Sequence, residues 1–218
     1  MNVTVSLGGS VVSENIEELD FIVDQIRDIA ERCEKVVVVV GAGSLKKYIG
    51  YCDQKCTNSE LDSVGIRATR LNASVLKSYF DGACGFIPSS FRELNKALES
   101  SDLIFMGGTE PGHSTDGVSA IAAETIGADV MVDATDVDGV LLEEDSEESA
   151  DVMTYSEVFE HIFSSSSDPG SYSLIDRTAK NVLERSDIDC VVVNGNKRDE
   201  ILRAVFGGHS GTLLTTEG

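Results

Sequence analysis

The sequence predicts an α/β fold, a three-layer αβα sandwich around a mostly parallel, open sheet. Short apolar runs recur along all 218 residues, and amphipathic helical patterns separate most of them. Several runs are apolar on both faces, as the strands of a parallel sheet covered by helices are. Since no linker or repeat divides the chain, residues 1–218 are expected to form a single domain.

The expected strands follow from these apolar runs, of which the five consecutive valines at 36–40 form the clearest. Such β-branched runs favour a fully buried strand. The full set is Asn2–Leu7, Val36–Val40, Cys84–Ile87, Leu103–Met106, Val130–Ala134, Cys190–Asn194 and Thr212–Thr215.

Helices are predicted from apolar residues spaced three or four apart. One stripe comprises Leu19, Ile22, Ile26, Ile29 and Cys33, a second comprises Leu61, Val64, Ala68, Leu71 and Val75, and a third pattern runs from Gly117 to Ile126. Capping boxes are suggested by Ser59 with Asp62, Ser90 with Glu93 and Thr154 with Glu157. The acidic segment 143–151 and the serine-rich segment 164–173 indicate loops, either mobile cover over a site or plain surface.

The charge balance limits the partners. With 17 basic and 38 acidic residues the net charge is −21, so nucleic acid and anionic membranes would be repelled. Five cysteines without Cys-x-x-Cys spacing predict free thiols, and no apolar segment approaches a membrane span, so a cytoplasmic protein is expected. The excess of acid favours a salt-adapted cytoplasm over a merely acidic mesophile.

Three glycine-rich loops follow apolar runs. They are Leu7-Gly8-Gly9-Ser10, Val40-Gly41-Ala42-Gly43-Ser44 and the stretch from Met106 to Asp116, which precedes a helix and carries the hydroxyls of Ser114 and Thr115. A loop of this kind offers free backbone N–H groups and the positive end of a helix dipole to a phosphate. A single such loop is equally a Gly/Pro turn capped by Thr115. Three on one sheet indicate a polyphosphate and a second phosphorylated substrate.

Two common nucleotide signatures are missing. The chain has no Gly-Lys-Ser/Thr, which argues against a P-loop fold. Gly41-Ala42-Gly43 begins like a dinucleotide fingerprint, but Lys46 occupies the third glycine position. The acids at the expected distance, Glu60 and Asp62, follow no strand, which argues against NAD.

Spaced motifs across the whole chain resemble the archaeal-type uridylate (UMP) kinases of the amino-acid kinase family. These motifs are Gly8-Gly-Ser10, the Gly41 loop, Asp62-Ser-Val-Gly65-Ile-Arg-Ala-Thr-Arg70-Leu-Asn72-Ala, Gly108-Thr109, Thr135-Asp-Val-Asp-Gly-Val140, Ser173-Leu-Ile-Asp176 and Gly207-Gly-His209-Ser-Gly211-Thr212. The resemblance implies an amino-acid kinase-like fold, transfer of the ATP γ-phosphoryl group to UMP, Mg²⁺ as a cofactor and a homo-oligomer, commonly a hexamer.

The resemblance also implies roles for individual residues. Lys47 and Gly9 would be catalytic. The ATP site would comprise Ser6, Leu7, Gly8, Gly9, Ser10, Gly43, Lys47, Thr135, Asp136, Leu141 and Glu144. The UMP site would comprise Ala42, Asp62, Thr109, Glu110, Pro111, Gly112, His113, Ser114 and Thr115. No protein-held metal site is expected, because the three histidines are dispersed.

The chain departs from the family pattern at four positions. Ser6 stands where many relatives carry a lysine on the first strand, Lys47 replaces an arginine, Leu141 a tyrosine and Glu144 an aspartate. Lysine keeps a point charge but loses bidentate geometry. Positive charge for phosphoryl transfer would then come from Mg²⁺, Lys46, Lys47, Arg67, Arg70 and helix N-termini. Each helix N-terminus is equivalent to about half a positive charge.

Several alternatives stay open. A kinase of another small phosphorylated substrate, such as isopentenyl phosphate, is the enzymatic alternative. A non-catalytic nucleotide- or oxyanion-binding protein on the same fold is the other. His113 either contacts UMP or braces its loop, and Asp138 and Asp176 either orient a lysine or Mg²⁺, or cap turns. Phe21, Ile22 and Ile29 either supply a subunit contact or pack in the core.

Overall fold

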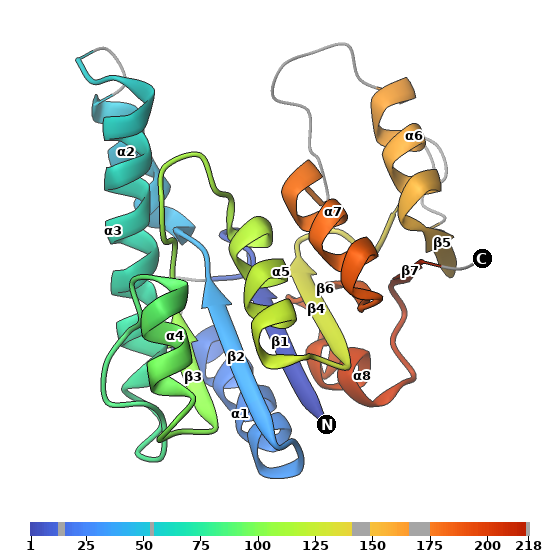
Figure 1. The fold of residues 1–218 in the computed structure, drawn as a ribbon, viewed down its shortest axis with the longest axis horizontal. Helices are drawn as coiled ribbons and strands as arrows, with labels where there is room; N and C mark the ends of the chain where they lie inside the picture. Colours follow the sequence, from blue (N-terminus) through green and yellow to red (C-terminus); the bar gives the residue numbers. More distant parts are fainter. Residues whose placement is uncertain (13–15, 53–54, 141–148, 166–174, 217–218) are drawn as a thin grey trace.

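The computed structural model describes residues 1–12, 16–52, 55–140, 149–165 and 175–216. Seven strands of this part form one sheet in the order β3-β2-β1-β4-β6-β7-β5 (Figure 1). All neighbouring strands are parallel except β6 and β7, which run antiparallel. The strands are β1 (Asn2–Leu7), β2 (Lys35–Val40), β3 (Leu103–Met106), β4 (Val130–Thr135), β5 (Val152–Thr154), β6 (Asp189–Asn194) and β7 (Thr212–Thr215).

Helices cover both faces of this sheet (Figure 1). They are α1 (Ile16–Arg32), α2 (Lys46–Cys52), α3 (Asn58–Lys77), α4 (Phe91–Ala97), α5 (Thr115–Ile126), α6 (Tyr155–Ser165), α7 (Arg177–Ser186) and α8 (Glu200–Phe206), with a 3₁₀ turn, η1 (Gly43–Leu45), before α2. The predicted three-layer αβα sandwich with a mostly parallel sheet is confirmed.

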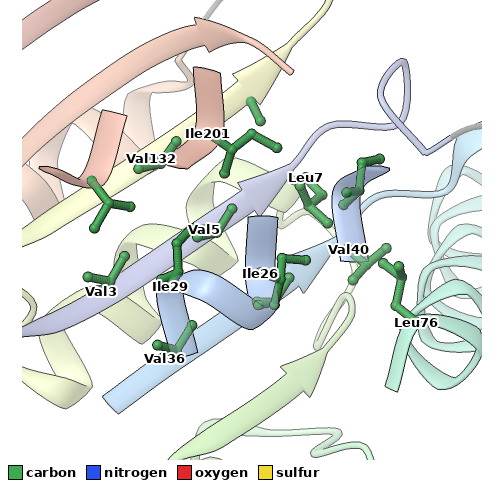
Figure 2. Packing of buried hydrophobic residues seen from close by; sticks show 14 of the residues in the cluster. Val3, Val5, Leu7, Ile26, Ile29, Val36, Val40, Leu76, Val132 and Ile201 are labelled. Atoms are coloured by element: carbon green, nitrogen blue, oxygen red, sulfur yellow. The ribbon is translucent and has the colours of Figure 1, made fainter. Parts of the chain in front are cut away.

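Two apolar clusters hold the layers together. On one face Val3, Val5 and Leu7 of β1 pack with Ile26 and Ile29 of α1, as Figure 2 shows. On the other face alternate strand residues, among them Val37, Val39, Ile104, Met106 and Met131, pack against α4, α5 and α7. The strands are buried on both sides because their side chains alternate between the two clusters.

Not every predicted element was correct. The run Cys84–Ile87 is not a strand; the backbone N–H of Cys84 donates to Leu103 O at 2.9 Å and no ladder continues from it. The short β5 was missed. On α3 the buried residues are Thr69, Ala73 and Leu76, whereas Leu71 and Val75 of the predicted stripe are 56% and 44% exposed.

The N-caps partly follow the sequence. Ser90 caps α4, and Thr154 and Glu157 exchange the two hydrogen bonds of a capping box. The box predicted for Ser59 and Asp62 is wrong, because Thr57 and Glu60 form it two residues earlier. Asp62 therefore lies beyond the cap, in the second turn of α3.

Candidate functional site

The sheet has a topological switch point between β1 and β4. The chain winds from β1 through β2 to β3 in one direction and returns to β4 on the other side of β1. Ligands of open α/β sheets bind beyond the carboxyl ends of the strands at such a point. A cavity of about 770 Å³ lies there.

Its walls come from the two first glycine loops, the start of α3, the start of α5 and the end of β4. The lining residues are Gly8, Gly9, Ser10, Ala42, Gly43, Ser44, Lys46, Ile49, Leu61, Asp62, Gly65, Ile66, Thr69, Gly108, His113, Ser114, Thr115, Asp116, Asp133 and Thr135. The volume lies within the range of small-molecule sites, roughly 300 to 1,000 Å³. One cavity thus collects ten of the twenty predicted site residues, from both the ATP set and the UMP set.

The first two glycine loops are packed backbone against backbone. A Cβ on Gly41 would lie 2.5 Å from the nitrogen of Gly9, and one on Gly9 would lie 3.1 Å from the nitrogen of Gly43. Gly8 N–H donates to Ala134 O at 2.8 Å, which ties the first loop to β4. Leu7, predicted to belong to the ATP site, is fully buried in the core and is not part of the cavity wall. Glycine is required here because the chains approach too closely for a side chain.

The two lysines after the second loop differ in position. Lys46 lines the cavity at the start of α2. Lys47, which was predicted to be catalytic, is absent from the cavity wall, and its ammonium lies 5.6 Å from the ring centroid of Tyr48. Of the two, the structure therefore presents Lys46 to a ligand in the cavity.

The third loop, predicted to hold UMP, is held in place by hydrogen bonds between side chains of α3 and its backbone. Arg70 donates to the carbonyl oxygens of Gly108 and Thr109 at 2.9 and 3.1 Å. The Asp62 carboxylate accepts from the N–H of Gly112 at 2.8 Å. Arg70 is thus a structural residue of the loop rather than the phosphate contact that the sequence suggested.

Some residues of this loop line the cavity, others are exposed to solvent, and Thr109 is buried. His113, Ser114 and Thr115 line the cavity, while Glu110 and Pro111 are exposed and Gly112 adopts φ +84° at the bend. Thr109 is 6% exposed, and its hydroxyl has no hydrogen-bond partner among the described residues.

The hydroxyl of Ser114, at the N-terminus of α5, makes two hydrogen bonds within the protein. Ser114, not Thr115, is the N-cap, accepting from Gly117 N–H at 2.9 Å. The same hydroxyl donates to the Asp176 carboxylate at 2.5 Å, and the other oxygen of Asp176 accepts from Ala179 N–H at the start of α7. Asp176 therefore acts as a cap and joins two helix ends.

The end of β4 presents Thr135 to the cavity, with its hydroxyl 3.2 Å from the carboxylate of exposed Asp136. Asp138 pairs with Lys197 at 2.8 Å and accepts from Asn194, contacts that lower its pKa. Leu141 and Glu144, predicted to hold ATP, lie outside the described residues.

Two acidic residues of the cavity wall were not predicted. Asp133 is 3% exposed in the interior of β4, and Asp116 lies in the first turn of α5. Ser6 lies opposite Asp133 in the β1–β4 register, and its hydroxyl donates to Asp116 at 3.3 Å. Burial and then the charge of Asp176 raise the pKa of Asp116 to about 7; burial and then Asp116 raise that of Asp133. The sequence signal for Asp133 is that it stands alone as an acid inside the otherwise apolar run Val130–Ala134.

The comparisons with known proteins identify the family. The sequence model described as the amino acid kinase family matches residues 1–194, and the chain belongs to this family. It is 34% identical to the uridylate kinase of Methanococcus vannielii, with 98% of this chain and 99% of the relative covered. It is 36% identical to the uridylate kinase of Archaeoglobus fulgidus, with 98% and 100% covered.

Solved structures agree with the fold. The crystal structure of uridylate kinase from Archaeoglobus fulgidus matches with a TM-score of 0.88 at 35% identity, covering 99% of this chain and 100% of that one. The UMP kinase of Bacillus anthracis matches with a TM-score of 0.80 at 18% identity, covering 100% of this chain and 96% of that one, and so supports the fold alone.

Proposed function

We propose that this protein is a UMP kinase that transfers the γ-phosphoryl group of ATP to UMP, giving UDP and ADP. One observation carries the proposal: two glycine loops and the loop before α5 border a single cavity at the switch point of the sheet. The full-length similarity to archaeal uridylate kinases supports the choice of substrate.

In this proposal Gly8, Gly9, Ser10 and Gly43 bind the ATP phosphates through backbone N–H groups, and Thr135 with Asp136 lies toward the nucleoside of ATP. UMP occupies the wall formed by Ala42, Asp62 and residues 109–115. The side chains of Ile49, Leu61 and Ile66 add an apolar surface on the same wall. Such a surface suits a flat base.

An oxygen of the UMP phosphate attacks the γ-phosphorus of ATP in line. A new P–O bond forms, the bond to the β-phosphate oxygen breaks, and ADP leaves with the electron pair. The nucleophile is already an anion, so no general base is needed. The work of the protein is to align two polyanions and to spread their charge, for which Lys46 and the N-terminus of α5 face the cavity.

Mg²⁺ fits this site as a companion of ATP. The described residues contain no group of three or more His, Cys, Asp or Glu side chains placed to hold a metal. Mg²⁺ usually keeps several waters and binds substrate phosphates with few protein ligands. When bound it neutralises the charge that develops between the phosphates, and activity is expected to require it.

A coupled assay tests the function. Mg-ATP is supplied with UMP, CMP, AMP or isopentenyl phosphate, at low and at molar KCl. UMP is expected to be turned over best. Faster turnover of isopentenyl phosphate than of UMP would show that isopentenyl phosphate, and not UMP, is the phosphoryl acceptor. Nucleotide binding without turnover at either salt concentration would favour the non-catalytic alternative.

The two lysines provide a matched pair. Lys46→Ala is expected to lower kcat about tenfold or more, because one charge on the transferring group is lost. Lys47→Ala is expected to have the smaller effect, because Lys47 is not on the cavity wall. Steady-state kinetics of both variants decide between them; a larger loss in Lys47→Ala would restore the role implied by the family resemblance.

We also propose that the protein forms a homo-oligomer, with the hexamer as the expected size. Of the suggested contact residues on the first helix, Ile22 and Ile29 are 2% and 0% exposed and belong to the core, and partly buried Phe21 packs against it, so they offer little surface to a second subunit. Leu71, Val75 and Tyr79 instead expose an apolar line along and beyond α3. Light scattering of the protein and of Leu71→Asp checks this; an unchanged mass would exclude this surface.

The charge of −21 supports a salt-rich cytoplasm as the place of action, and the free thiols of the described cysteines support a reducing one. No described helix has the length and apolar character that crossing a membrane requires. Screening shortens the Debye length to roughly 3 Å at 1 M salt and relieves the self-repulsion of the chain. Unfolding is therefore expected to need more denaturant at molar KCl than at low KCl, and an equal midpoint would contradict salt adaptation.

A further inference from the structure

Two carboxyl groups share one hydroxyl at the bottom of the cavity. Ser6 and Asp133 face each other across β1 and β4, and Asp116 approaches Ser6 from the start of α5. Both acids line the cavity wall. The Ser6 hydroxyl has a single proton to donate, and its Oγ lies 3.3 Å from Oδ1 of Asp116. It cannot serve both carboxylates at once.

No cation compensates for this pair within the described part of the chain. None of its ion pairs involves Asp116 or Asp133. The other ionisable groups around the pair are Asp176 at the start of α7 and the Cys190 thiol on β6, whose pKa burial raises. Lys46 and His113 are exposed on the cavity wall.

Two neighbouring carboxylates, of which Asp133 is buried and Asp116 half-buried, cannot both be ionised at low cost when a third lies nearby and no cation pairs with them. Burial favours the neutral form of Asp133 most, since it is 3% exposed in the strand interior. A neutral carboxylic acid is a hydrogen-bond donor, whereas a carboxylate can only accept. The protonated form would therefore suit a phosphate, which the ionised form would repel.

We infer that Asp133 retains a proton, with Asp116 as its ionisable neighbour and Ser6 as the positioning residue between them, and that this acid donates a hydrogen bond to a nucleotide phosphate in the cavity. The inference rests on the proposed function and adds a catalytic residue to it. The proton comes from solvent and stays on the carboxyl group throughout the transfer. Phosphate binding is then linked to proton binding.

Calorimetry on the intact protein measures this linkage. ATP and UMP are titrated separately, with and without Mg²⁺, at alkaline pH in two buffers that differ in ionisation enthalpy. At least one nucleotide is expected to take up about one proton on binding. Its affinity should fall roughly tenfold per pH unit once the acid ionises in the free protein. The nucleotide that shows the uptake identifies the phosphate concerned.

Asp133→Asn supplies the decisive variant, because its amide donates a hydrogen bond at every pH. Proton uptake and the alkaline fall in affinity should both vanish while binding persists. Asp102→Asn removes one charge at the opposite end of the sheet and should leave the uptake intact. An infrared carboxylic-acid band present in the unliganded protein and absent from Asp133→Asn checks the proton without any ligand.

Nucleotide binding with no proton uptake, or a band unaffected by Asp133→Asn, would overturn the inference while the kinase function stood. Loss of Mg²⁺-dependent binding in Asp133→Asn would also overturn it, since the carboxylates would then hold a metal. Failure of ATP and UMP to bind at any pH would remove the proposed function and this inference together.

Discussion

The two faces of the central strands differ in kind. On the face toward α1 and α8, strand β1 presents the apolar side chains of Val3, Val5 and Leu7. On the face toward α5 the same strand places Thr4 and Ser6, both fully buried, beside Asp133 of β4. The face toward α1 supplies hydrophobic stabilisation. The face toward α5 contains buried polar groups, which lower the free energy of unfolding, and it extends to the cavity.

The apolar face should tolerate truncation least. Ile26 is fully buried between α1 and the sheet (Figure 2). Ile26→Ala is expected to lower the free energy of unfolding by about 2 to 5 kcal/mol, because a methylene-rich side chain is replaced by a cavity. Denaturant unfolding measures the loss, and kcat at low temperature should be unchanged. A variant that kept its stability but lost turnover would contradict this division of the two faces.

The loops at the strand ends should be the most sensitive part for chemistry. Gly41→Ala places a Cβ 2.5 Å from the backbone nitrogen of Gly9, so the two loops must separate. A displacement near 1 Å can cost about a hundredfold in rate. We expect that loss in kcat/KM. Gly50→Ala is the control, because its Cβ would meet open space.

The polar face should make stability depend on pH. The raised carboxyl pKa values mean that the folded state binds protons which the unfolded chain has released. Stability is therefore lost as pH rises from about 4, the ordinary aspartate value, through about 7, the pKa of Asp116. The gain in stability from Asp133→Asn should grow over this window by at most about 1.4 kcal/mol per pH unit for each proton. Unfolding curves from pH 4 to pH 8 (in roughly unit steps) measure it, and a constant difference would refute it.

The smallest effect concerns a single hydroxyl. Thr4 is fully buried and its Oγ1 has no hydrogen-bond partner among the described residues. Thr4→Val should stabilise the fold by about 1 kcal/mol, because an unsatisfied polar group is removed without change of shape. Thr212→Val is the matched control. Its hydroxyl bonds Val140 N and Ala150 O at 2.8 and 2.6 Å, so the same substitution should destabilise.

Much of the fold was predictable because local patterns carry it. The valine run gave β2, and the spacing of Leu19, Ile22, Ile26 and Ile29 gave the buried face of α1. The stripe on α3 was misjudged because two adjacent helix faces are both partly apolar. Only packing decides that Leu76 is buried and Leu71 is not.

The candidate site was predictable where backbone geometry requires particular residues. The glycines at 8, 9 and 43 do border one cavity, as their positions after parallel strands indicated. Arg70 was misassigned, because a sequence cannot tell whether a guanidinium meets a ligand or the carbonyls of its own loop.

The sequence by itself determined the layers, most strands and the phosphate-receptive loops, because alternation, helical period and glycine content act over a few residues. Only the tertiary structure decided that Ser6, Asp116 and Asp133 meet, since they lie on three different elements and Ser6 is 110 residues from Asp116 in the chain. The physical reason is that strand register and helix docking set these distances. The charge state of a carboxyl group depends on such neighbours and on burial, neither of which is a property of the residue alone.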